Sequence, residues 1–329
     1  MKNLGYIFRR LFDMNYKAML QKINSIHKKT GKSRLWILRD MQRCAVNYGA
    51  GYMDYDLFEM YNLTAEQRDT YITRGRNNAL IKQYNDPAYG YLLRNKGEFN
   101  ARFHEFVRRE WVYLSEKDVA LDFMSRHEVF MAKPMNGTCG KGIEKIYMER
   151  EENPEAVWQR LSAQGAYLLE EVIRQHPAVS AIYPEAINTL RTVTIRKEGV
   201  THVICTYFRI GNNGRHVDNF NSGGMVAPVD EKTGIVADRA IDKNKILYAV
   251  HPMTGTQIQG FQFPDWEAAM DMVRRAAELI PELGYLGWDI AFTEDGPILV
   301  EGNEFPGHDI YQLPEHTPDK IGIMPKFRV

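Results

Sequence analysis

The sequence predicts an α+β protein, with a mainly helical N-terminal region over residues 1–90 and a mixed region of strands and helices over residues 91–329. Near the N-terminus, apolar residues recur at steps of three and four, which is the period of an amphipathic helix. Beyond residue 91, short runs rich in β-branched and aromatic residues indicate strands. A chain of 329 residues also suits either two packed lobes or one domain with a helical extension.

The N-terminal region is strongly basic, although the whole chain has a net charge of zero. Eleven Lys or Arg residues and only two acidic residues lie between residues 1 and 43. Such an arm favours an anionic partner. Its apolar stripe, within residues 4–26, either packs on the body of the protein or lies on an anionic membrane, and Gly31 is placed to end the helix. No RRM, KH or zinc-finger pattern accompanies the arm, so we expect no nucleic acid partner.

The cysteines and the apolar runs indicate a cytoplasmic protein. Cys44, Cys139 and Cys205 are far apart and form no CxxC pair, which argues against a disulfide framework or a zinc site. The sequence shows no leader-like segment and no apolar run of membrane-spanning length. We therefore expect a soluble protein, or one that is peripheral at the inner face of a membrane.

Local signals place individual elements. Thr64 and Gln67 have the spacing of a capping box, which predicts a helix start. Asn85, Asp86 and Pro87 predict the loop that closes the helical region. Strands are expected at residues 128–133, 167–172, 189–196, 202–210, 288–292 and 298–301, and a helix at residues 266–279.

The last two expected strands form a hairpin. Glu294-Asp295-Gly296 suits a three-residue loop, with glycine at the position that needs a left-handed backbone. This loop pairs Thr293 with Pro297 and, further along the strands, Asp289 with Glu301. One face of the hairpin is then apolar, with Ile290, Phe292, Ile298 and Val300.

Asp289, Glu301 and Asn303 converge on the other face of this hairpin. Two opposed carboxylates repel each other unless a positive group lies between them. Oxygen-only ligands suit a hard cation such as Mg²⁺. From the hairpin alone an alternative remains open, in which Lys or Arg neutralises the acids or a shifted register separates them.

A glycine-rich loop lies between two strand-like segments at residues 133–146. Lys133 ends the first segment, and the loop contains Gly137, Thr138, Gly140 and Lys141. Glycines let backbone N–H groups approach an anion, while Lys adds charge and Thr a hydroxyl donor. The pattern is neither GxxxxGK[ST] nor GxGxxG in a βαβ unit. It predicts a flap over the phosphates of a nucleotide, with an ordinary flexible hairpin as the alternative.

The ordered set of motifs resembles the ATP-grasp superfamily. The resemblance lies in Lys133 with the glycine loop, LLEEVI at residues 168–173 and the late Asp…Glu-x-Asn set. The segments HPAVSAIYPEAINTLRTVTI, DNFNSGG and GWDIAFTEDGPILVEGNEFPG resemble its sugar-transfer-associated branch, and the similarity runs in order over residues 91–313. It implies an ATP-grasp fold, in which two α/β lobes, at residues 91–168 and 169–329, sandwich ATP.

The resemblance also implies which residues hold ATP and two Mg²⁺ ions. Asp289, Glu301 and Asn303 are the implied metal ligands. The implied ATP contacts are Lys96, Lys133, Gly137, Thr138, Gly140, Lys141, Glu170, Glu171, Val172 and His176. For Lys96 the alternative is a solvated surface residue, and for His176 it is a helix-capping or packing residue.

Arginines and a polar loop are implied to act on the substrate. Arg191 and Arg209, with Lys141, are expected to stabilise the transferring phosphoryl group, because guanidinium donors suit phosphate and carboxylate. A structural ion pair of Arg209 with Asp218 or another acid is the alternative. The implied substrate contacts are Asn188, Thr189, Arg191, Asp218, Asn219, Ser222 and Gly223.

The reaction implied by the resemblance is an ATP-dependent ligation of a carboxylate to an amine through an acyl phosphate. Its implied setting is surface polysaccharide biosynthesis, with an amino acid joined to a sugar acid or an amino sugar. The substrate is then a small molecule or glycan that carries a carboxylate or an amine. The alternatives are a phosphotransferase on a sugar or small acid, and a non-catalytic nucleotide-binding module.

Overall fold

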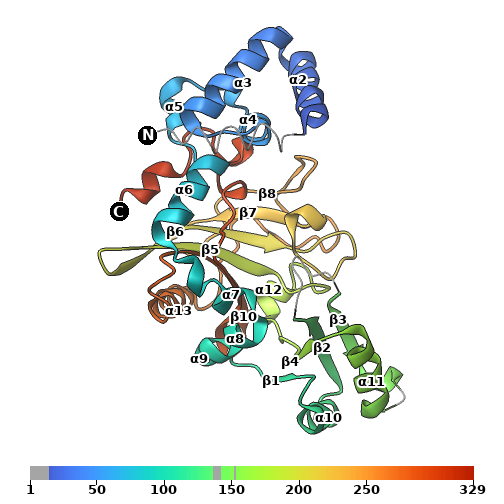
Figure 1. The fold of residues 1–329 in the computed structure, drawn as a ribbon. Coiled ribbons are helices and arrows are strands. Elements are labelled where there is room, and N and C mark those ends of the chain that lie inside the picture. Colours follow the sequence, from blue (N-terminus) through green and yellow to red (C-terminus); the bar gives the residue numbers. More distant parts are fainter. Residues whose placement is uncertain (1–14, 136–141, 152) are drawn as a thin grey trace. The chain divides into compact units, whose positions relative to one another are not determined.

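The computed structural model describes residues 15–135, 142–151 and 153–329 (Figure 1). The chain divides into two compact units. One contains the chain up to Leu80 together with His308–Arg328, and the other contains Ile81–Gly307 and Val329. The C-terminal segment thus belongs to the same unit as the N-terminal helices. The predicted domain boundary between residues 90 and 91 remains a proposal.

The first unit is helical. Its elements are α2 (Tyr16–Thr30), α3 (Arg34–Tyr48), α4 (Tyr52–Leu57), η1 (Met60–Asn62), α5 (Ala65–Asp69) and most of α6 (Arg74–Tyr84), followed at the C-terminus by η5 (Ile310–Gln312), η6 (Pro314–His316) and η7 (Met324–Phe327). Gly31, at φ 71°, ends α2, and Thr64 forms a capping box with Gln67 at the start of α5. Both predicted signals are therefore confirmed.

The apolar stripe of α2 packs inward at Ile23 and Ile26, whereas Leu20 is 55% exposed. Ile23 and Ile26 lie in a core shared with Ile37 and Met41 of α3. At Ile23 and Ile26 the stripe thus packs on the body of the protein, which is one of the two alternatives. The first part of the stripe, residues 4–12, lies outside the described residues. No helix in the described ranges is both long and apolar enough to cross a membrane.

A buried ion pair crosses the core of the helical unit. Arg68 donates to both oxygens of Asp40, at 2.9 and 2.7 Å, and Tyr55 donates its hydroxyl to the same carboxylate at 2.8 Å. Asp40 is 4% exposed and Arg68 is 8% exposed. Each charge is thus compensated inside the core, as burial requires.

The second unit contains two antiparallel sheets. The smaller sheet has the order β1-β4-β2-β3. Its strands are β1 (Trp111–Tyr113), β2 (Val129–Pro134), β3 (Glu144–Tyr147) and β4 (Tyr167–Glu171), covered by α10 (Lys117–Arg126) and α11 (Pro154–Gln164). The predicted lobe boundary at residues 168 and 169 falls inside β4, which lies entirely in this sheet.

The larger sheet has seven strands in the order β11-β10-β5-β6-β7-β8-β9. They are β5 (Thr189–Lys197), β6 (Val200–Ile210), β7 (Met225–Val229), β8 (Ala240–Ile241), β9 (Leu247–Tyr248), β10 (Tyr285–Thr293) and β11 (Gly296–Asn303). One face packs against α13 (Trp266–Glu278), and β11 also contacts α7 (Tyr91–Arg94), α8 (Lys96–Arg102) and α9 (His104–Val107). The remaining short elements are η2 (Pro87–Tyr89), η3 (Met148–Arg150), α12 (Pro177–Ser180) and η4 (Phe220–Ser222).

The C-terminal hairpin forms with a different loop from the predicted one. Thr293 pairs with Gly296, which has φ 99°, so two residues and not three separate the paired positions. The predicted pairing of Thr293 with Pro297 is wrong for this reason. A β-bulge between Asp289 and Ile290 then restores the predicted pairing of Asp289 with Glu301. The apolar face contains Ile290, Phe292 and Leu299, and not Ile298 and Val300 as predicted.

The buried ion pair of the helical unit gives a stability prediction. Arg68→Ala leaves the Asp40 carboxylate buried without its guanidinium partner, so we expect a loss of about 3 kcal/mol in the free energy of unfolding. Lys22→Ala removes a partly exposed pair with Asp56 and should cost less than about 1 kcal/mol. Urea unfolding of both variants measures the difference, and equal losses would contradict the assigned role of Arg68.

Candidate functional site

Strand alternation gathers charged side chains on the polar face of the larger sheet. Leu190, Phe208 and Ile290 point into the core, so the residues adjacent to them in each strand point to the opposite face. Among these adjacent residues are Arg191 on β5, Arg209 on β6 and Asp289 on β10. Register pairs Asp289 with Arg191 on one side and with Glu301 on the other.

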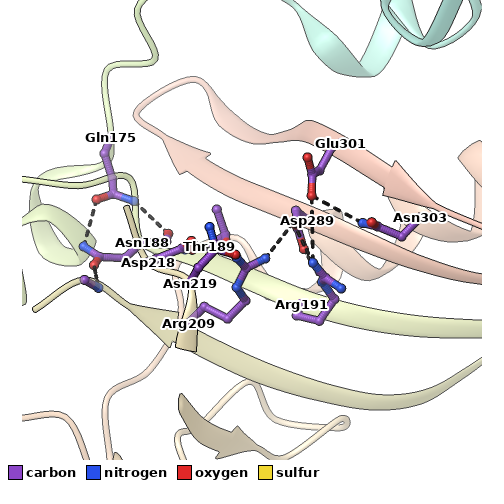
Figure 2. Close-up of polar contacts among 11 residues, drawn as sticks. Gln175, Asn188, Thr189, Arg191, Arg209, Asp218, Asn219, Asp289, Glu301 and Asn303 are labelled. Carbon is purple, nitrogen blue, oxygen red and sulfur yellow. Dashed lines mark hydrogen bonds and ion pairs between the residues drawn. The ribbon is translucent and has the colours of Figure 1, made fainter. Parts of the chain in front are cut away.

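Asp289 is the centre of this face (Figure 2). Its Oδ1 accepts from Arg191 Nε, and its Oδ2 accepts from Arg191 at 2.9 Å and from Arg209 at 2.7 Å. Asp289 is only 3% exposed. Burial alone would favour the neutral acid, but the two guanidinium groups outweigh it and hold the pKa of Asp289 well below its usual range.

Arg209 links Asp289 to a second acid. It donates to Asp218 Oδ1 at 3.0 Å and to Asn219 Oδ1 at 2.5 Å. Asp218 Oδ2 accepts from the backbone N–H of Thr189 at 3.1 Å and from its hydroxyl. Burial raises the pKa of Asp218, although Arg209 opposes this shift. The predicted substrate residues Thr189, Asp218 and Asn219 thus hold Arg209 in place, as the ion-pair alternative expected.

Glu301 and Asn303 extend the face toward solvent. The Glu301 side chain is 58% exposed, lies 3.9 Å from Arg191 and accepts from Asn303 Nδ2 at 3.4 Å. Loss of solvation around its carboxyl group, and then repulsion by Asp289, raise the pKa of Glu301 to about 7. Because more than half of this side chain is exposed, solvent screens part of the effect.

The donor set fits a hard cation at Glu301 and Asn303. A nearby positive charge would relieve the repulsion that raises the pKa of Glu301. Asp289 fits as a third ligand only when an arginine gives up one of its oxygens. Among the described residues, no cluster of three or more His, Cys, Asp or Glu side chains is suited to a metal ion. A site here therefore depends on the Asn303 amide, which suits Mg²⁺.

Gly302, between these two candidate ligands, lies against the core. A Cβ atom at this position would come within 2.9 Å of Leu93 and 3.2 Å of Phe99. The close approach of β11 to α7 and α8 therefore requires a glycine, and the two side chains on either side of it point to the polar face.

A second charged cluster lies between the smaller sheet and β11. Glu170 accepts from Lys133 at 2.5 Å, from Arg109 at 2.9 Å and from Asn100 at 3.0 Å. Burial of Glu170 opposes ionisation, but Arg109 and Lys133 keep the pKa of this carboxyl group well below its usual range. Arg109 also donates to the backbone carbonyls of residues 299 and 300 on β11, at 2.7 and 3.3 Å.

Lys96 and Lys133 belong to the same cluster. Lys96 donates to the Pro134 carbonyl at 2.8 Å. Burial and the neighbouring Lys133 lower the pKa of Lys96, while Glu301 and Glu170 oppose the shift. The predicted phosphate lysines and the candidate metal hairpin are therefore close enough to interact electrostatically. Sequence reasoning missed Arg109 and Asn100, because no local motif marks either residue.

The other predicted residues have varied positions. Val172 follows the end of β4, and Glu171 accepts from the Glu110 N–H at 3.3 Å. His176 caps α12 through Nδ1, which matches the capping alternative. The structure places Ser222 at the end of η4 and Gly223 after it at φ 100°. The flap residues Gly137, Thr138, Gly140 and Lys141 lie outside the described residues.

Asn188 is fully buried and engaged within the protein. Its Nδ2 donates to Gln175 Oε1 and to the Tyr183 carbonyl at 3.1 and 2.8 Å, and its Oδ1 accepts from the Gly211 N–H at 3.0 Å. Gln175 returns a bond to the Asn188 carbonyl at 2.8 Å. We therefore leave Asn188 out of the proposed substrate contacts, since it anchors the chain before β5.

A family model described as sugar-transfer associated ATP-grasp matches residues 75–318. The chain belongs to this family. The match covers both sheets and the candidate site, so the predicted resemblance and fold class are confirmed. No curated protein matches this ATP-grasp protein at a significant level.

Solved structures of other ATP-grasp proteins are similar to this one only in part. The ADP complex of N5-carboxyaminoimidazole ribonucleotide synthetase has 13% identity and a TM-score of 0.42, over 66% of this chain and 46% of that chain. The ATP-grasp ligase PsnB with its minimal precursor, Mg and ADP has 16% identity and a TM-score of 0.41, over 68% and 54%. D-alanyl-alanine synthetase A from Vibrio cholerae has 14% identity and a TM-score of 0.41, over 73% and 59%. This chain thus spans about half the length of the first two.

The Glu170 cluster gives a pH-dependent prediction. The pKa of Glu170 is lower in the folded protein than its ordinary value of about 4.5, so its ion pairs stabilise the fold above this pH and are lost as pH falls through the folded-state pKa. We expect Glu170→Gln to cost about 3 kcal/mol in the free energy of unfolding near neutral pH, and less at lower pH. Urea unfolding at a series of pH values tests this.

The neighbouring half-buried acid supplies the control for this series. Glu171→Gln removes a carboxylate that accepts one backbone N–H, so its cost should stay below about 1.5 kcal/mol. A cost of Glu170→Gln that does not change with pH would show that the carboxylate is not held ionised by Arg109 and Lys133.

Proposed function

We propose that this ATP-grasp protein is a ligase that uses ATP and Mg²⁺ to join a carboxylate to an amine. The observation that carries the proposal is the row of Arg209, Arg191, Asp289 and Glu301 across four adjacent strands. This row offers guanidinium groups to a phosphoryl group and carboxylate oxygens to a cation on one face. Such a face promotes catalysis by positioning and charge stabilisation, and it needs no side-chain nucleophile.

The first proposed step moves a phosphoryl group. A carboxylate oxygen of the substrate attacks the γ-phosphorus of ATP, the bond to the ADP oxygen breaks, and an acyl phosphate and ADP result. Arg191, which is more exposed than Arg209, is the group that can exchange a carboxylate oxygen of Asp289 for a phosphate oxygen. Arg209 stays anchored by Asp218 and Asn219 and supplies a fixed charge.

The second proposed step forms the amide. The amine attacks the carbonyl carbon of the acyl phosphate, the C–O bond to phosphate breaks, and the amine gives up a proton as inorganic phosphate leaves. Arg191 and Arg209 stabilise the charge on the departing phosphate. Exclusion of water is needed at this stage, because water competes with the amine for the acyl phosphate.

ATP and the cation would be held by the two charged clusters together. Lys96 and Lys133 supply ammonium groups for phosphate oxygens, and Glu301 and Asn303, with Asp289, supply oxygens for Mg²⁺. Bound Mg²⁺ would offset the negative charge of the phosphates and orient them. The flap lysine Lys141 remains a proposed contact from the resemblance alone.

The substrate class and the setting are proposals as well. The family description associates these proteins with sugar transfer, which supports a glycan or sugar acid as one substrate and an amino acid as the other. A role in surface polysaccharide biosynthesis would place the protein in the cytoplasm. We also propose that the basic N-terminal region makes peripheral contact with the anionic inner face of the membrane.

ADP release measured over uronic acids and amino acids, alone and in pairs, tests the reaction type. A ligase releases ADP fastest when both an acid and an amine are present, and mass spectrometry then finds the amide. ADP release with one acceptor and a stable phosphorylated product would establish a phosphotransferase instead. ATP binding without ADP release from any mixture would favour a non-catalytic nucleotide-binding module.

The candidate metal hairpin is tested by Glu301→Ala. Loss of this carboxylate should lower kcat/KM by about 100-fold and raise the Mg²⁺ concentration that gives half-maximal activity. Glu294→Ala, an exposed acid in the turn of the same hairpin, is the matched control and should keep wild-type values. Full activity of Glu301→Ala would exclude this metal site.

The role of Arg191 is separated from ATP binding by kinetics. Arg191→Ala should lower kcat by about 100-fold with little change in KM for ATP, because the guanidinium acts mainly on charge that develops during transfer. Arg209 still pairs with Asp289 in this variant, so the fold should persist, and a thermal unfolding curve checks this. If Arg191→Ala raised the KM for ATP and left kcat unchanged, Arg191 would contact ATP in the ground state and would not stabilise the transition state.

A further inference from the structure

The helical hairpin of α2 and α3 has one packed side and one open side. Ile23 and Ile26 of α2, with Ile37 and Met41 of α3, face the core of the unit. Both helices contact α4 on this side, and α3 also contacts η1. Arg34 at the start of α3 donates to Asn24 of α2 at 2.6 Å, which holds the two helices together near their connection.

Charges differ between the two sides of this hairpin. On the packed side Lys22 pairs with Asp56 of α4 at 2.6 Å, and Lys29 pairs with Glu59. Asp40, the single acid within residues 16–48, is buried against Arg68. The remaining Lys and Arg residues of the hairpin form no ion pair within the described part of the chain; these are Lys17, Lys28, Lys32, Arg34, Arg39 and Arg43. The charged side chains of this hairpin that lack an ion pair are therefore all cationic.

Large apolar side chains lie among these cations. Leu35 is 56% exposed, Trp36 42% and Val46 50%, all on α3, and Leu20 of α2 is 55% exposed. The spacing of Leu35, Arg39, Arg43 and Val46 puts them along one stripe of α3. Lys32 lies 4.2 Å from the centroid of the Trp36 ring. We call this set of cationic and apolar residues the hairpin face.

Charge decides what can cover the hairpin face. The N-terminal segment of the same chain is itself basic, with Lys2, Arg9 and Arg10 against Asp13. A second copy of the hairpin presents the same positive face, so either occupant brings repulsion. An anionic partner is required. Nucleic acid would use the cations but leave the aliphatic residues in water, whereas a lipid interface accommodates both.

We propose that the hairpin face docks this protein on an anionic lipid surface. Arg39, Arg43, Lys28 and Lys32 lie at the level of the lipid headgroups, and Leu35, Trp36 and Val46 enter the interfacial layer. This inference rests on the membrane contact included in the proposed function, and it assigns that contact to particular residues. It does not depend on the ligase reaction.

Vesicle binding by the full chain tests the docking surface. The wild-type protein should sediment with phosphatidylcholine vesicles that contain about a third of phosphatidylglycerol, should not sediment with phosphatidylcholine alone, and should be released by high salt. Arg39→Glu/Arg43→Glu should lower the partition coefficient by about tenfold or more. Lys243→Glu/Arg274→Glu, which reverses two exposed cations of the second unit, should bind as wild type does.

The apolar contribution has its own readout. Brominated lipids should quench part of the tryptophan fluorescence of wild type, and Trp36→Phe should remove that part. Equal binding to neutral and anionic vesicles, or equal losses in the two charge-reversal variants, would overturn the proposal. So would a lack of vesicle binding together with binding of single-stranded nucleic acid that needs Arg39 and Arg43. ADP release by Arg39→Glu/Arg43→Glu with soluble substrates should equal wild type, which separates failure of docking from failure of the ligase.

Discussion

The buried carboxylate of Asp289 constrains the register of four strands. An ionised acid at this depth is costly unless several donors hold it, and its donors come from β5 and β6 on one side of β10. A slip of one residue in any of these pairings would turn a guanidinium or the carboxylate into the apolar core. The polar face of the larger sheet is therefore fixed by charge compensation as well as by the apolar residues beneath it.

The β-bulge in the C-terminal hairpin follows from the same constraint. The two-residue turn at Thr293 and Gly296 would by itself place Asp289 opposite Val300, and an extra residue on β11 moves Glu301 into that position. The pairing of Asp289 with Glu301 was predicted correctly from the sequence. The prediction reached it with a three-residue loop and no bulge, whereas the structure has a two-residue turn and a bulge. The turn residues are compatible with both solutions, and the observed one combines a two-residue turn with a bulge.

Local signals were sufficient for the capping box at Thr64, the helix end at Gly31 and the strands with strong β-propensity. They were insufficient for side chains whose role is set by distant partners. The family resemblance implied a substrate contact for Asn188, whereas in the structure this side chain bonds to Gln175, Tyr183 and Gly211. Arg109 carries no local signature, and its importance appears only when Glu170 and β11 are brought to it. The structure contains the contacts of three alternatives that the sequence left open, namely arginine compensation of Asp289, the pairing of Arg209 with Asp218 and the capping of α12 by His176, while the predicted ligand roles of these residues stay predictions.

Charge balance over the two clusters explains why nucleotide and cation should bind together. The two clusters together contain nearly equal numbers of cations and acids, so their summed charge is close to neutral; the cations are Lys96, Lys133, Arg109, Arg191 and Arg209, and the acids are Glu170, Asp218, Asp289 and Glu301. A triphosphate alone would add several negative charges beside Asp289 and Glu301, and a cation alone would compete with Arg191 for Asp289. In the proposed mechanism, a cation bound together with the nucleotide would replace part of the charge that Arg191 supplies to Asp289, and the Arg191 guanidinium would then contact a phosphate oxygen. The ion pairs of Asp289 with Arg191 and Arg209 would thus make the binding of each ligand dependent on the other.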